Sequence, residues 1–357
     1  MTQQTSQTPP GVPGPLPSFT FFGRSDDDPQ SWADALRLNP DGFRPGQFEW
    51  WYTDGHLSNG MTFVASYHLE IDAEGVVRPY VTINLATPDG VVQDEKVRFD
   101  ASEATFDREI CHARVGPHFI RSHDGLKHYE IFVDPGANGG NGLHLHLERA
   151  VQSYAPGPDD GTEPPGPYFR WVCAVPSGTL RGTITIGGVE HEVIGSGYHD
   201  HNWGNVPMGV LVRDWHWARG SAGEYTAVAA SVRFNNGMTL NNVFVASPAA
   251  VAIAEAGPGV GFRASGPVAQ PDTGKRIEGE AHFSAGDETS GTVRFSGEKV
   301  MSSFIFDRDP QFNWWYTRFD AALEIEIRHG DDLVRRSGRA ILEHMDFRGE
   351  TRHGEGG

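Results

Sequence analysis

The chain has 357 residues, which at about 150 residues per domain suggests two domains. Its 47 acidic residues outnumber the 29 basic ones and give a formal charge of −18, so we expect neither nucleic acid nor an anionic membrane surface as a partner, because both require a basic patch. Hydrophobic residues at 38% can form a core, while 44 glycines and 24 prolines are typical of a fold with many turns.

Residues 1–45 are expected to form a flexible arm, since their first part is polar and rich in proline and glycine. Within the arm, Ser31–Leu38 is expected to form one or two helical turns that end at Pro40. From Phe48 onward, alternating β-forming residues are separated by glycine-containing turns, which predicts a meander of antiparallel strands. The first strands expected are Phe48–Leu57, Met61–Ile71, Val76–Ala86 and Val91–Phe99.

The second half of the chain is also predicted to be β-structure. Ser153–Pro167, rich in proline, glycine and aspartate, is the expected linker. The clearest hairpin joins Thr179–Ile186 to Val189–Ile194 through Gly187-Gly188. Later strands are expected at Tyr168–Val175, Val210–Arg219, Tyr225–Phe234, Thr239–Ala246, Lys275–Phe283, Gly291–Phe295, Phe319–Arg328 and Leu333–Glu343. The sequence FEWWYT at 48–53 recurs as FNWWYT at 312–317, which indicates two related halves unless the recurrence is coincidental.

Three short stretches combine aromatic and titratable side chains. Their residues are Tyr198, His199, Asp200, His201, Asn202 and Trp203 in the first stretch, Trp215, His216 and Trp217 in the second, and Glu49, Trp51 and Tyr52 in the third. We interpret the first as functional, because so many titratable groups rarely crowd into a plain strand. On a strand, Trp215 and Trp217 would share one face and His216 the other. For the second and third stretches, packing of large rings is the alternative.

Metal binding is the other chemistry that the histidines suggest. His-x-His pairs occur at 144–146 and 199–201, and such pairs on a strand can chelate zinc or iron. A complete site would need further ligands, which His216, Glu148 or Asp200 could supply only if the fold brought them close. We favour a solvated or hydrogen-bonded strand face for the first pair. We therefore expect no metal and, without a phosphate-binding motif between strand and helix, no cofactor.

Three motifs, taken in order, resemble the AttH/CrtC family, the hydroxyneurosporene synthase or carotenoid 1,2-hydratase group. They are FEWWYTDGHLSNGMTF from residue 48, SGTLRGTITIGGVEHEVIGSGYHDHNWG from residue 177 and DWHWARG from residue 214. The resemblance implies two tandem lipocalin-like antiparallel β-barrels, at 46–175 and 176–350, followed by a tail at 351–357. It also implies a hydrophobic pocket near the junction of the barrels.

Within this resemblance, the family aspartate matches Asp200 and the tryptophan after it matches Trp203. His199 and His201 on either side of the aspartate depart from the hydratase pattern and are closer to the cyclase-like branch, which includes fungal Diels–Alderase-type enzymes. Adding a proton to an isolated alkene requires a neutral acid in a dry site, where burial raises the pKa of an aspartate. Tryptophan and tyrosine faces would stabilise the resulting cation.

These residues support two kinds of chemistry. Capture of the cation by water would give hydration, and capture by an internal alkene would give a ring. In a pericyclic cyclase, the pocket would fold a polyene, and a donor such as His201, Asn202 or Tyr52 would polarise a carbonyl. The expected catalytic residues are Asp200, His201, His199 and Trp203, and the expected substrate-binding residues are Glu49, Trp51, Tyr52, Tyr198, Asn202, Trp215, His216 and Trp217.

The sequence thus predicts a cofactor-independent enzyme of the lyase or isomerase type. Its substrate would be a hydrophobic polyene, terpenoid or polyketide-type intermediate. The alternative is a lipocalin-type carrier of a lipid or terpenoid, which needs the pocket but no acid. The chain shows no secretory signal and no apolar run that could span a membrane, so we expect a cytoplasmic monomer or weak homo-oligomer without stable membrane insertion.

Overall fold

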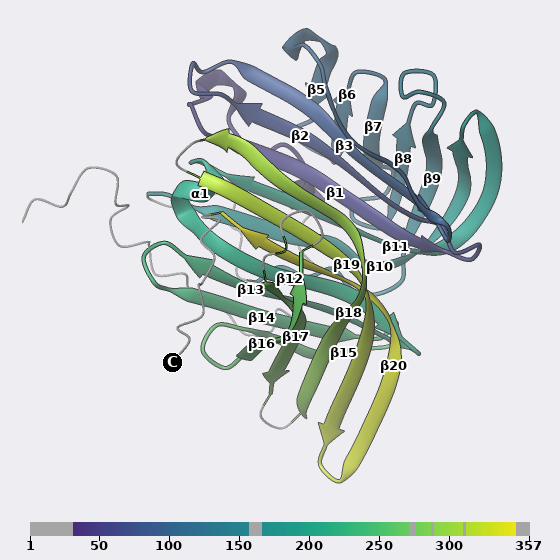
Figure 1. Ribbon diagram of the computed structural model, residues 1–357, viewed down its shortest axis with the longest axis vertical. Coiled ribbons are helices and arrows are strands. Elements are labelled where there is room, and N and C mark those ends of the chain that lie inside the picture. Colours follow the sequence, from purple (N-terminus) through teal and green to yellow (C-terminus); the bar gives the residue numbers. More distant parts are fainter. Residues whose placement is uncertain are drawn as a thin grey trace, which may run out of the picture.

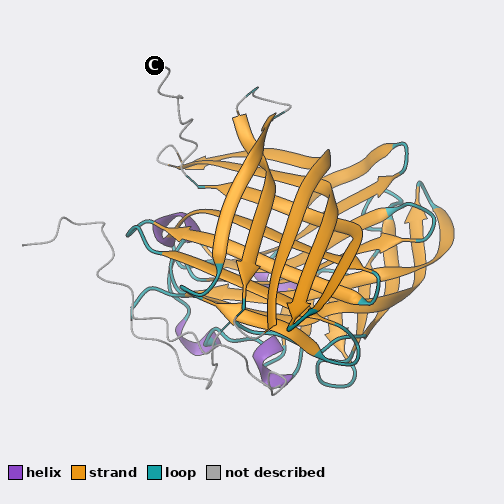
Figure 2. Cartoon of the chain, turned by 90° about the horizontal axis from the view of Figure 1, so that it is seen from below, coloured by secondary structure: helices purple, strands orange, loops and turns teal. Residues whose placement is uncertain are grey.

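The computed structural model describes residues 31–156, 166–270, 274, 276–286, 289–309 and 312–347. Two curled antiparallel sheets account for most of this part of the chain, and helical turns are few (Figures 1 and 2). The expected all-β class with two tandem lipocalin-like barrels is therefore confirmed, each barrel being one curled sheet. No helix among the described residues is long and apolar enough to cross a membrane.

The first sheet contains eleven strands in the order β4-β3-β2-β1-β11-β10-β9-β8-β7-β6-β5. Alternating apolar residues of these strands, such as Phe63, Tyr67 and Leu145, form a core inside the curl. The strands are β1 (Phe48–Leu57), β2 (Thr62–Ile71), β3 (Val77–Thr87), β4 (Gly90–Arg98), β5 (Ala104–Phe106), β6 (His112–Val115), β7 (His118–Ser122), β8 (His128–Val133), β9 (Gly142–Arg149), β10 (Phe169–Ile186) and β11 (Val189–Gly204).

The second sheet contains nine described strands in the order β15-β14-β13-β12-β20-β19-β18-β17-β16, around a core that includes Phe283, Phe295 and Phe319. The strands are β12 (Val212–Ala222), β13 (Tyr225–Phe234), β14 (Thr239–Ala246), β15 (Val251–Ala256), β16 (Gly261–Ala269), β17 (Arg276–Ala285), β18 (Thr289–Asp309), β19 (Phe312–His329) and β20 (Asp332–Asp346). The helical elements are the 3-10 turns η1 (Ser31–Asp34), η2 (Pro40–Gly42) and η3 (Ala101–Glu103) and the short helix α1 (Met208–Leu211).

The two sheets share a topology, because in each the first strand pairs with the last: β1 with β11, and β12 with β20. The two Trp-Trp-Tyr copies nevertheless occupy non-equivalent strands. The first copy lies on β1, whose counterpart is β12, whereas the second lies on β19. The halves are related in architecture, but the recurring motif does not mark equivalent positions in them.

The expected boundary after residue 175 falls inside strand β10, which is continuous with the first sheet. The chain leaves that sheet only after Gly204 and enters the second at Val212. We therefore propose 205–211 as the boundary between the two units. Residues 157–165 of the expected linker lie outside the described residues. Residues 1–30 of the expected arm and the whole expected tail at 351–357 also lie outside them.

Residues 31–38 correct the expectation of a flexible arm that reaches to residue 45. Ser31–Asp34 forms a single 3-10 turn instead of a longer helix, and Pro40 begins a second turn rather than ending the first. Asp34 and Leu38 are buried against the first sheet. The sequence pattern missed this packing because the contacts that order the segment come from β1 and β11, far along the chain.

Candidate functional site at the junction of the sheets

Strand β11 carries the densest group of predicted site residues, and its alternation sends them to opposite faces of the first sheet. Across the β1–β11 pair, Tyr52 lies opposite Asp200 and Trp51 lies opposite His201. Directly opposed side chains share a face, so residues adjacent in sequence point to different sides. The predicted group is therefore divided between two environments.

One of these faces packs against the second sheet, and we call the layer between the two sheets the junction. Tyr52 and Tyr198 of the first sheet meet Trp217 of the second, with ring centroids 5.7 and 5.2 Å from the tryptophan ring. Farther along, Tyr154 stacks on Phe244 with 4.8 Å between centroids. Aromatic rings from both sheets thus line the junction.

Asp200 is the acidic group at the centre of this aromatic region. It is 5% exposed and accepts hydrogen bonds from Tyr198 Oη at 2.7 Å, Trp171 Nε1 at 2.8 Å and Asn202 Nδ2 at 2.8 Å. Burial raises the pKa of Asp200 to about 6, although the bonds from Tyr198 and Trp171 act in the opposite direction. A carboxyl with this pKa can hold a proton at mildly acidic pH and release it near neutrality.

Two buried ion pairs also lie in the junction. Arg219 of β12 binds Asp54 of β1, whose other oxygen accepts a hydrogen bond from Tyr52 Oη at 2.8 Å. Arg318 binds Glu343 at 2.8 Å, and its guanidinium carbon lies 5.6 Å from the centroid of the Tyr52 ring. The first pair joins the two sheets directly, so the positions of the aromatic rings depend on it.

Several buried polar atoms in the junction have no hydrogen-bond partner among the described residues. They include Ser66 Oγ and His68 Nε2 on β2, Trp217 Nε1 on β12 and Asn242 Oδ1 on β14. Strand pairing places Ser66 on the same face as Tyr52. An unsatisfied buried polar atom costs about 1–3 kcal/mol, so a cluster of them is the expected lining for a ligand with polar groups or for ordered water.

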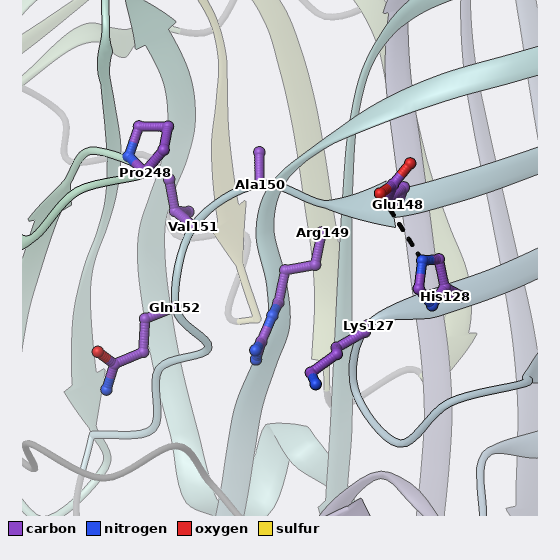
Figure 3. Close-up of a pocket in the computed structure, with 8 residues that line it drawn as sticks. All are labelled: Lys127, His128, Glu148, Arg149, Ala150, Val151, Gln152 and Pro248. Carbon is purple, nitrogen blue, oxygen red and sulfur yellow. Dashed lines mark ion pairs between the residues drawn. The ribbon is translucent and has the colours of Figure 1, made fainter.

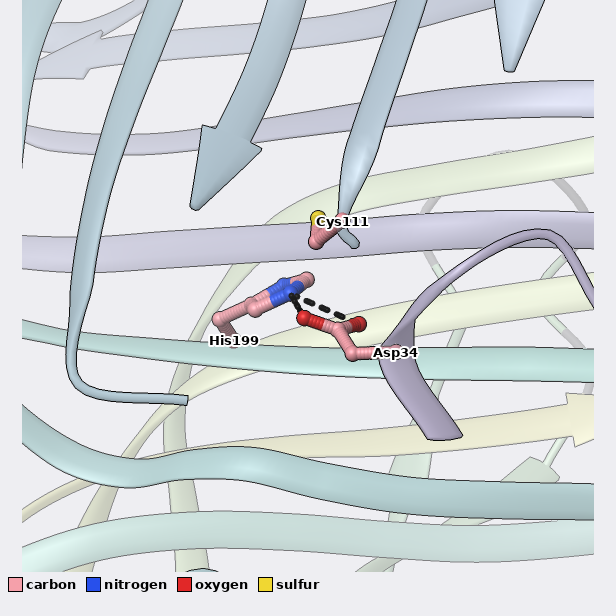
Figure 4. Close-up of side chains that lie close together, drawn as sticks. All are labelled: Asp34, Cys111 and His199. Atoms are coloured by element: carbon pink, nitrogen blue, oxygen red, sulfur yellow. Dashed lines mark hydrogen bonds and ion pairs between the residues drawn. The ribbon is translucent and has the colours of Figure 1, made fainter. Parts of the chain in front are cut away.

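On the opposite face of β11, His199 and Asp34 form a buried ion pair (Figure 4). His199 Nε2 lies 3.1 Å from Asp34 Oδ2, its Nδ1 lies 2.8 Å from the Tyr52 carbonyl oxygen, and Tyr129 donates to Asp34 at 2.6 Å. Burial by itself would raise the pKa of Asp34, but the neighbouring imidazoles and Tyr129 lower it below its usual value. For His199 the directions are reversed: burial by itself would lower its pKa, but the neighbouring Asp34 raises it above its usual value. Both shifts favour a charged pair.

Glu49 and His201 lie beside this pair and hold the N-terminal segment. Glu49 is fully buried and lies 2.8 Å from His201 Nε2, while the backbone amides of Arg37 and Leu38 donate to its two oxygens at 2.7 and 2.9 Å. The other ring nitrogen of His201 lies 2.9 Å from the Ala33 carbonyl oxygen. Both imidazole nitrogens of His201 thus face protein acceptors, which suits positioning of residues 33–38 rather than contact with a substrate.

Replacing Glu49 with leucine tests this anchoring role. The change leaves two backbone amides and one imidazole nitrogen without their acceptor, so we expect a loss of about 3 kcal/mol or more in the free energy of unfolding. Urea denaturation measures the loss, and hydrogen–deuterium exchange should accelerate in peptides covering residues 31–45. The exposed Glu190→Leu serves as the control and should change stability by no more than about 0.5 kcal/mol. Unchanged exchange in the segment would contradict the anchoring role.

The structure sorts the twelve predicted site residues into three groups. In the junction lie Tyr52, Tyr198, Asp200, Asn202, Trp215 and Trp217; on the opposite face of the first sheet lie Glu49, Trp51, His199, His201 and Trp203; and inside the second sheet lies His216. Trp171, Asp54, Arg219, Arg318 and Glu343 were not predicted. Alternation could have indicated Asp54 and Arg219, each two residues from a predicted aromatic on the same strand face. Arg318 and Glu343 carry no such local signal.

Two groups of described side chains have the composition of a metal site. Asp34, Cys111 and His199 are one, but the contacts above already occupy Asp34 and His199, and burial raises the pKa of the Cys111 thiol, which keeps it protonated. The second group is His216, Glu278 and His344. Of the His-x-His pairs, 144–146 lies on a strand face where His144 bonds Glu130 at 2.9 Å, in line with the hydrogen-bonded face that the sequence favoured.

A surface hollow lies apart from all of these residues (Figure 3). Lys127 and Arg149 extend into it, His128 and Glu148 form a 3.7 Å ion pair at one side, and Pro248 closes the other. None of the residues lining this hollow is a predicted site residue. Its charged lining differs from the aromatic lining of the junction and does not suit a hydrophobic substrate.

Comparison with known proteins relates the chain to a small group of folds. No family model matches it. A hydroxyneurosporene dehydrogenase of Chlorobaculum tepidum is 38% identical over 56 residues, and this match spans 14% of the chain and 15% of that relative. The chain thus spans only a small part of the curated relative that it matches.

Solved structures match over nearly the whole chain. CghA in complex with Sch210972 has a TM-score of 0.65 at 14% identity, covering 94% of this chain and 98% of CghA. A protein of Nitrosomonas europaea described as AttH has a TM-score of 0.60 at 14% identity, covering 88% and 97% of the two chains. Kievitone hydratase of Nectria haematococca has a TM-score of 0.52 at 13% identity, covering 92% and 98%. The resemblance seen in the sequence is therefore confirmed for the fold, and the chain has the two-sheet architecture of AttH, CghA and kievitone hydratase.

Proposed function

We propose that the chain is an enzyme of the AttH/CrtC family that hydrates or cyclises a hydrophobic polyene, terpenoid or polyketide-type substrate in the junction. The observation that carries the proposal is Asp200, a buried carboxyl with its pKa raised to about 6 among aromatic rings. A carrier needs a pocket, but burying an ionisable carboxyl such as that of Asp200 costs free energy and does not help a carrier to bind an apolar ligand. The likeness in fold to kievitone hydratase and CghA supports the same reaction class.

In the proposed hydration, protonated Asp200 gives its proton to an alkene carbon, and the π electrons form the new C–H bond. The cation left on the neighbouring carbon is stabilised by the faces of Trp217 and Tyr52. Water then adds through its oxygen and returns a proton to Asp200, so the net change is addition of one water. When an internal alkene captures the cation instead, loss of a proton to Asp200 gives a ring and an isomer of the substrate.

The N-terminal segment takes a supporting part in this proposal. His199, which was expected to be catalytic, donates to the backbone oxygen of Tyr52, while its other nitrogen binds Asp34. We assign His199, His201 and Trp203 to positioning β1 and β11, and Asp200 to the chemistry. Unpaired polar atoms such as Ser66 Oγ and His68 Nε2 would bind polar groups of the substrate.

Two probes test the proposal, kievitone and neurosporene, each incubated with the protein in water enriched in oxygen-18. Hydration is expected to give a product that carries the heavy oxygen, detected by mass spectrometry, whereas cyclisation would give an unlabelled isomer. Quenching of tryptophan fluorescence reports binding in the same samples, since Trp171 and Trp217 line the junction. Binding of both probes without conversion of either would favour the carrier.

A further inference from the structure

We propose that His216, His344 and Glu278 form a binding site for a divalent first-row transition metal ion inside the second sheet. One nitrogen of each imidazole and one carboxylate oxygen lie within 4.8 Å of one another. This site is separate from the junction, because His216 lies on the face of β12 opposite to Trp215 and Trp217.

Strand pairing brings the two histidines together. His216 on β12 is the direct cross-strand partner of His344 on β20. Their rings are stacked, with 4.3 Å between centroids and 13° between planes, so both imidazoles project in the same direction. Glu278 comes from β17, which is not a neighbour of β12 or β20 in the sheet order. A metal ion bound by all three would therefore link β17 to the β12–β20 pair, with which β17 is not paired in the sheet.

The imidazole of His216 has a buried nitrogen that is available to bind a ligand. His216 is 4% exposed, and its Nε2 is buried without a hydrogen-bond partner among the described residues. A buried imidazole nitrogen without a hydrogen-bond partner is an available ligand position, so a metal ion bound there would satisfy it.

The surrounding charges favour a cation at this position. The carboxylates of Glu278, Asp346 and Asp214 are the largest electrostatic influences on His344, followed by the opposing Arg233. Arg233 pairs with Asp214 at 2.5 Å, so its charge is directed to that carboxylate. Asp214 also lies 3.8 Å from Arg213 Nε, so two guanidinium groups balance its charge. The carboxylate of Glu278 is then the negative charge within the site that would attract a divalent ion.

Two imidazoles and one carboxylate define the class of metal. Nitrogen and oxygen donors in this ratio suit Zn²⁺, Fe²⁺, Co²⁺ or Ni²⁺ and leave positions open for water or another small ligand. Metal–ligand bonds of about 2.0–2.2 Å require the three donor atoms to approach one another by rotation of their side chains. The side chain of Glu278, at the partly exposed edge of the site, has the most room to move.

The test uses the full-length protein freed of metal by a chelator. With Co²⁺ as the probe, visible absorption should saturate at one ion per chain, and Zn²⁺ should raise the melting temperature and displace the Co²⁺. Glu278→Gln and His344→Asn are each expected to weaken Co²⁺ binding by more than about 100-fold, because removing a ligand costs more than removing its supporting contacts. Glu278→Gln changes a partly exposed side chain, so its fold is preserved and its result decides the proposal if His344→Asn does not fold.

Two variants on the same strand serve as controls, since the chain has 16 histidines, any of which can bind metal weakly. Glu280→Gln and His282→Asn lie on β17 outside the site and should bind Co²⁺ as the wild type does. The proposal is overturned if Glu278→Gln binds Co²⁺ with wild-type affinity, or if His282→Asn lowers the affinity as much as His344→Asn.

Discussion

Replacing Asp200 with asparagine is expected to lower turnover by about 10²–10⁴-fold while leaving substrate affinity nearly unchanged, because asparagine keeps the shape of the carboxyl but has no proton to transfer. The variant should fold, since the amides at 200 and 202 can rotate to satisfy each other, as Asn202 Nδ2 and Asp200 Oδ1 do now. Conversion of the substrate and fluorescence titration measure the two effects separately. Turnover within about twofold of the wild type would exclude Asp200 as the acid.

The pH dependence offers a second measure of the same group. If protonated Asp200 is the acid, the rate is highest below about pH 6 and falls as the pH rises through that value. Tyr198→Phe removes a hydrogen bond that lowers the pKa of Asp200, so its rate profile should move to higher pH. A profile that instead rises through pH 6 would show that the ionised carboxylate is the active form.

The titration of Asp200 should also contribute to the free energy of unfolding, and this contribution should decrease as the pH rises. The pKa of Asp200 rises from 3.8 to about 6 on folding, so between these values the native state holds a proton that the unfolded state releases. This contribution to the free energy of unfolding is complete below about pH 4 and is lost as the pH rises through about 6. Urea denaturation at pH 5 and pH 7 measures the change, and the contribution of Asp200 is the difference between the wild type and Asp200→Asn. The comparison is needed because buried histidines with a lowered pKa, such as His68 and His216, change stability in the opposite direction in both proteins.

Replacing Arg219 with methionine is expected to lower the free energy of unfolding by about 3–5 kcal/mol. The change leaves the Asp54 carboxylate buried without the guanidinium that balanced its charge. Among the described residues, Tyr52 is then its remaining side-chain donor. Burial lowers the pKa of Arg219 to about 10, so the group is charged in the wild type at neutral pH. Urea denaturation at constant m-value measures the change.

Two further variants distinguish the cost of leaving Asp54 without its partner from the cost of losing the Arg219 side chain itself. The double variant Asp54→Leu with Arg219→Met removes both charges and should regain most of the lost stability, because an apolar pair needs no compensation. Arg336→Met disrupts the exposed pair with Glu224 and should cost at most about 1 kcal/mol. An equal effect of Arg336→Met and Arg219→Met would contradict a special role for the buried pair.

Strand positions were the most reliable part of the sequence prediction. Phe48–Leu57, Tyr225–Phe234 and Thr239–Ala246 coincide with β1, β13 and β14. The Gly187-Gly188 turn joins β10 to β11 as expected, and both glycines have positive φ, 57° and 81°, which two-residue hairpins of type I′ require. Alternation and turn chemistry are local properties, so a single sequence carries them.

The site was predicted only in part, for a physical reason that β11 illustrates. Alternation alone places Asp200 and His199 on opposite faces of a strand, but it does not say what covers each face. His199 is covered by Asp34, 165 residues away in the sequence, and Asp200 lies at the contact with the second sheet. The sequence prediction treated residues 198–203 as one catalytic group. In the structure, Asp200 lies on the junction face of β11, whereas His199 and His201 lie on the opposite face and contact the N-terminal segment.

By itself, the sequence determined the all-β class and the strand and turn pattern, because these depend on residue type and period. The resemblance of its motif to a known family made Asp200 the candidate acid. Only the tertiary structure decided that Arg219 meets Asp54 and that His216 meets His344 and Glu278. Such contacts depend on which strands pair and which sheets stack. Strand pairing and sheet packing are determined by the free energy of the whole chain, so the residues next to each site in the sequence do not indicate them.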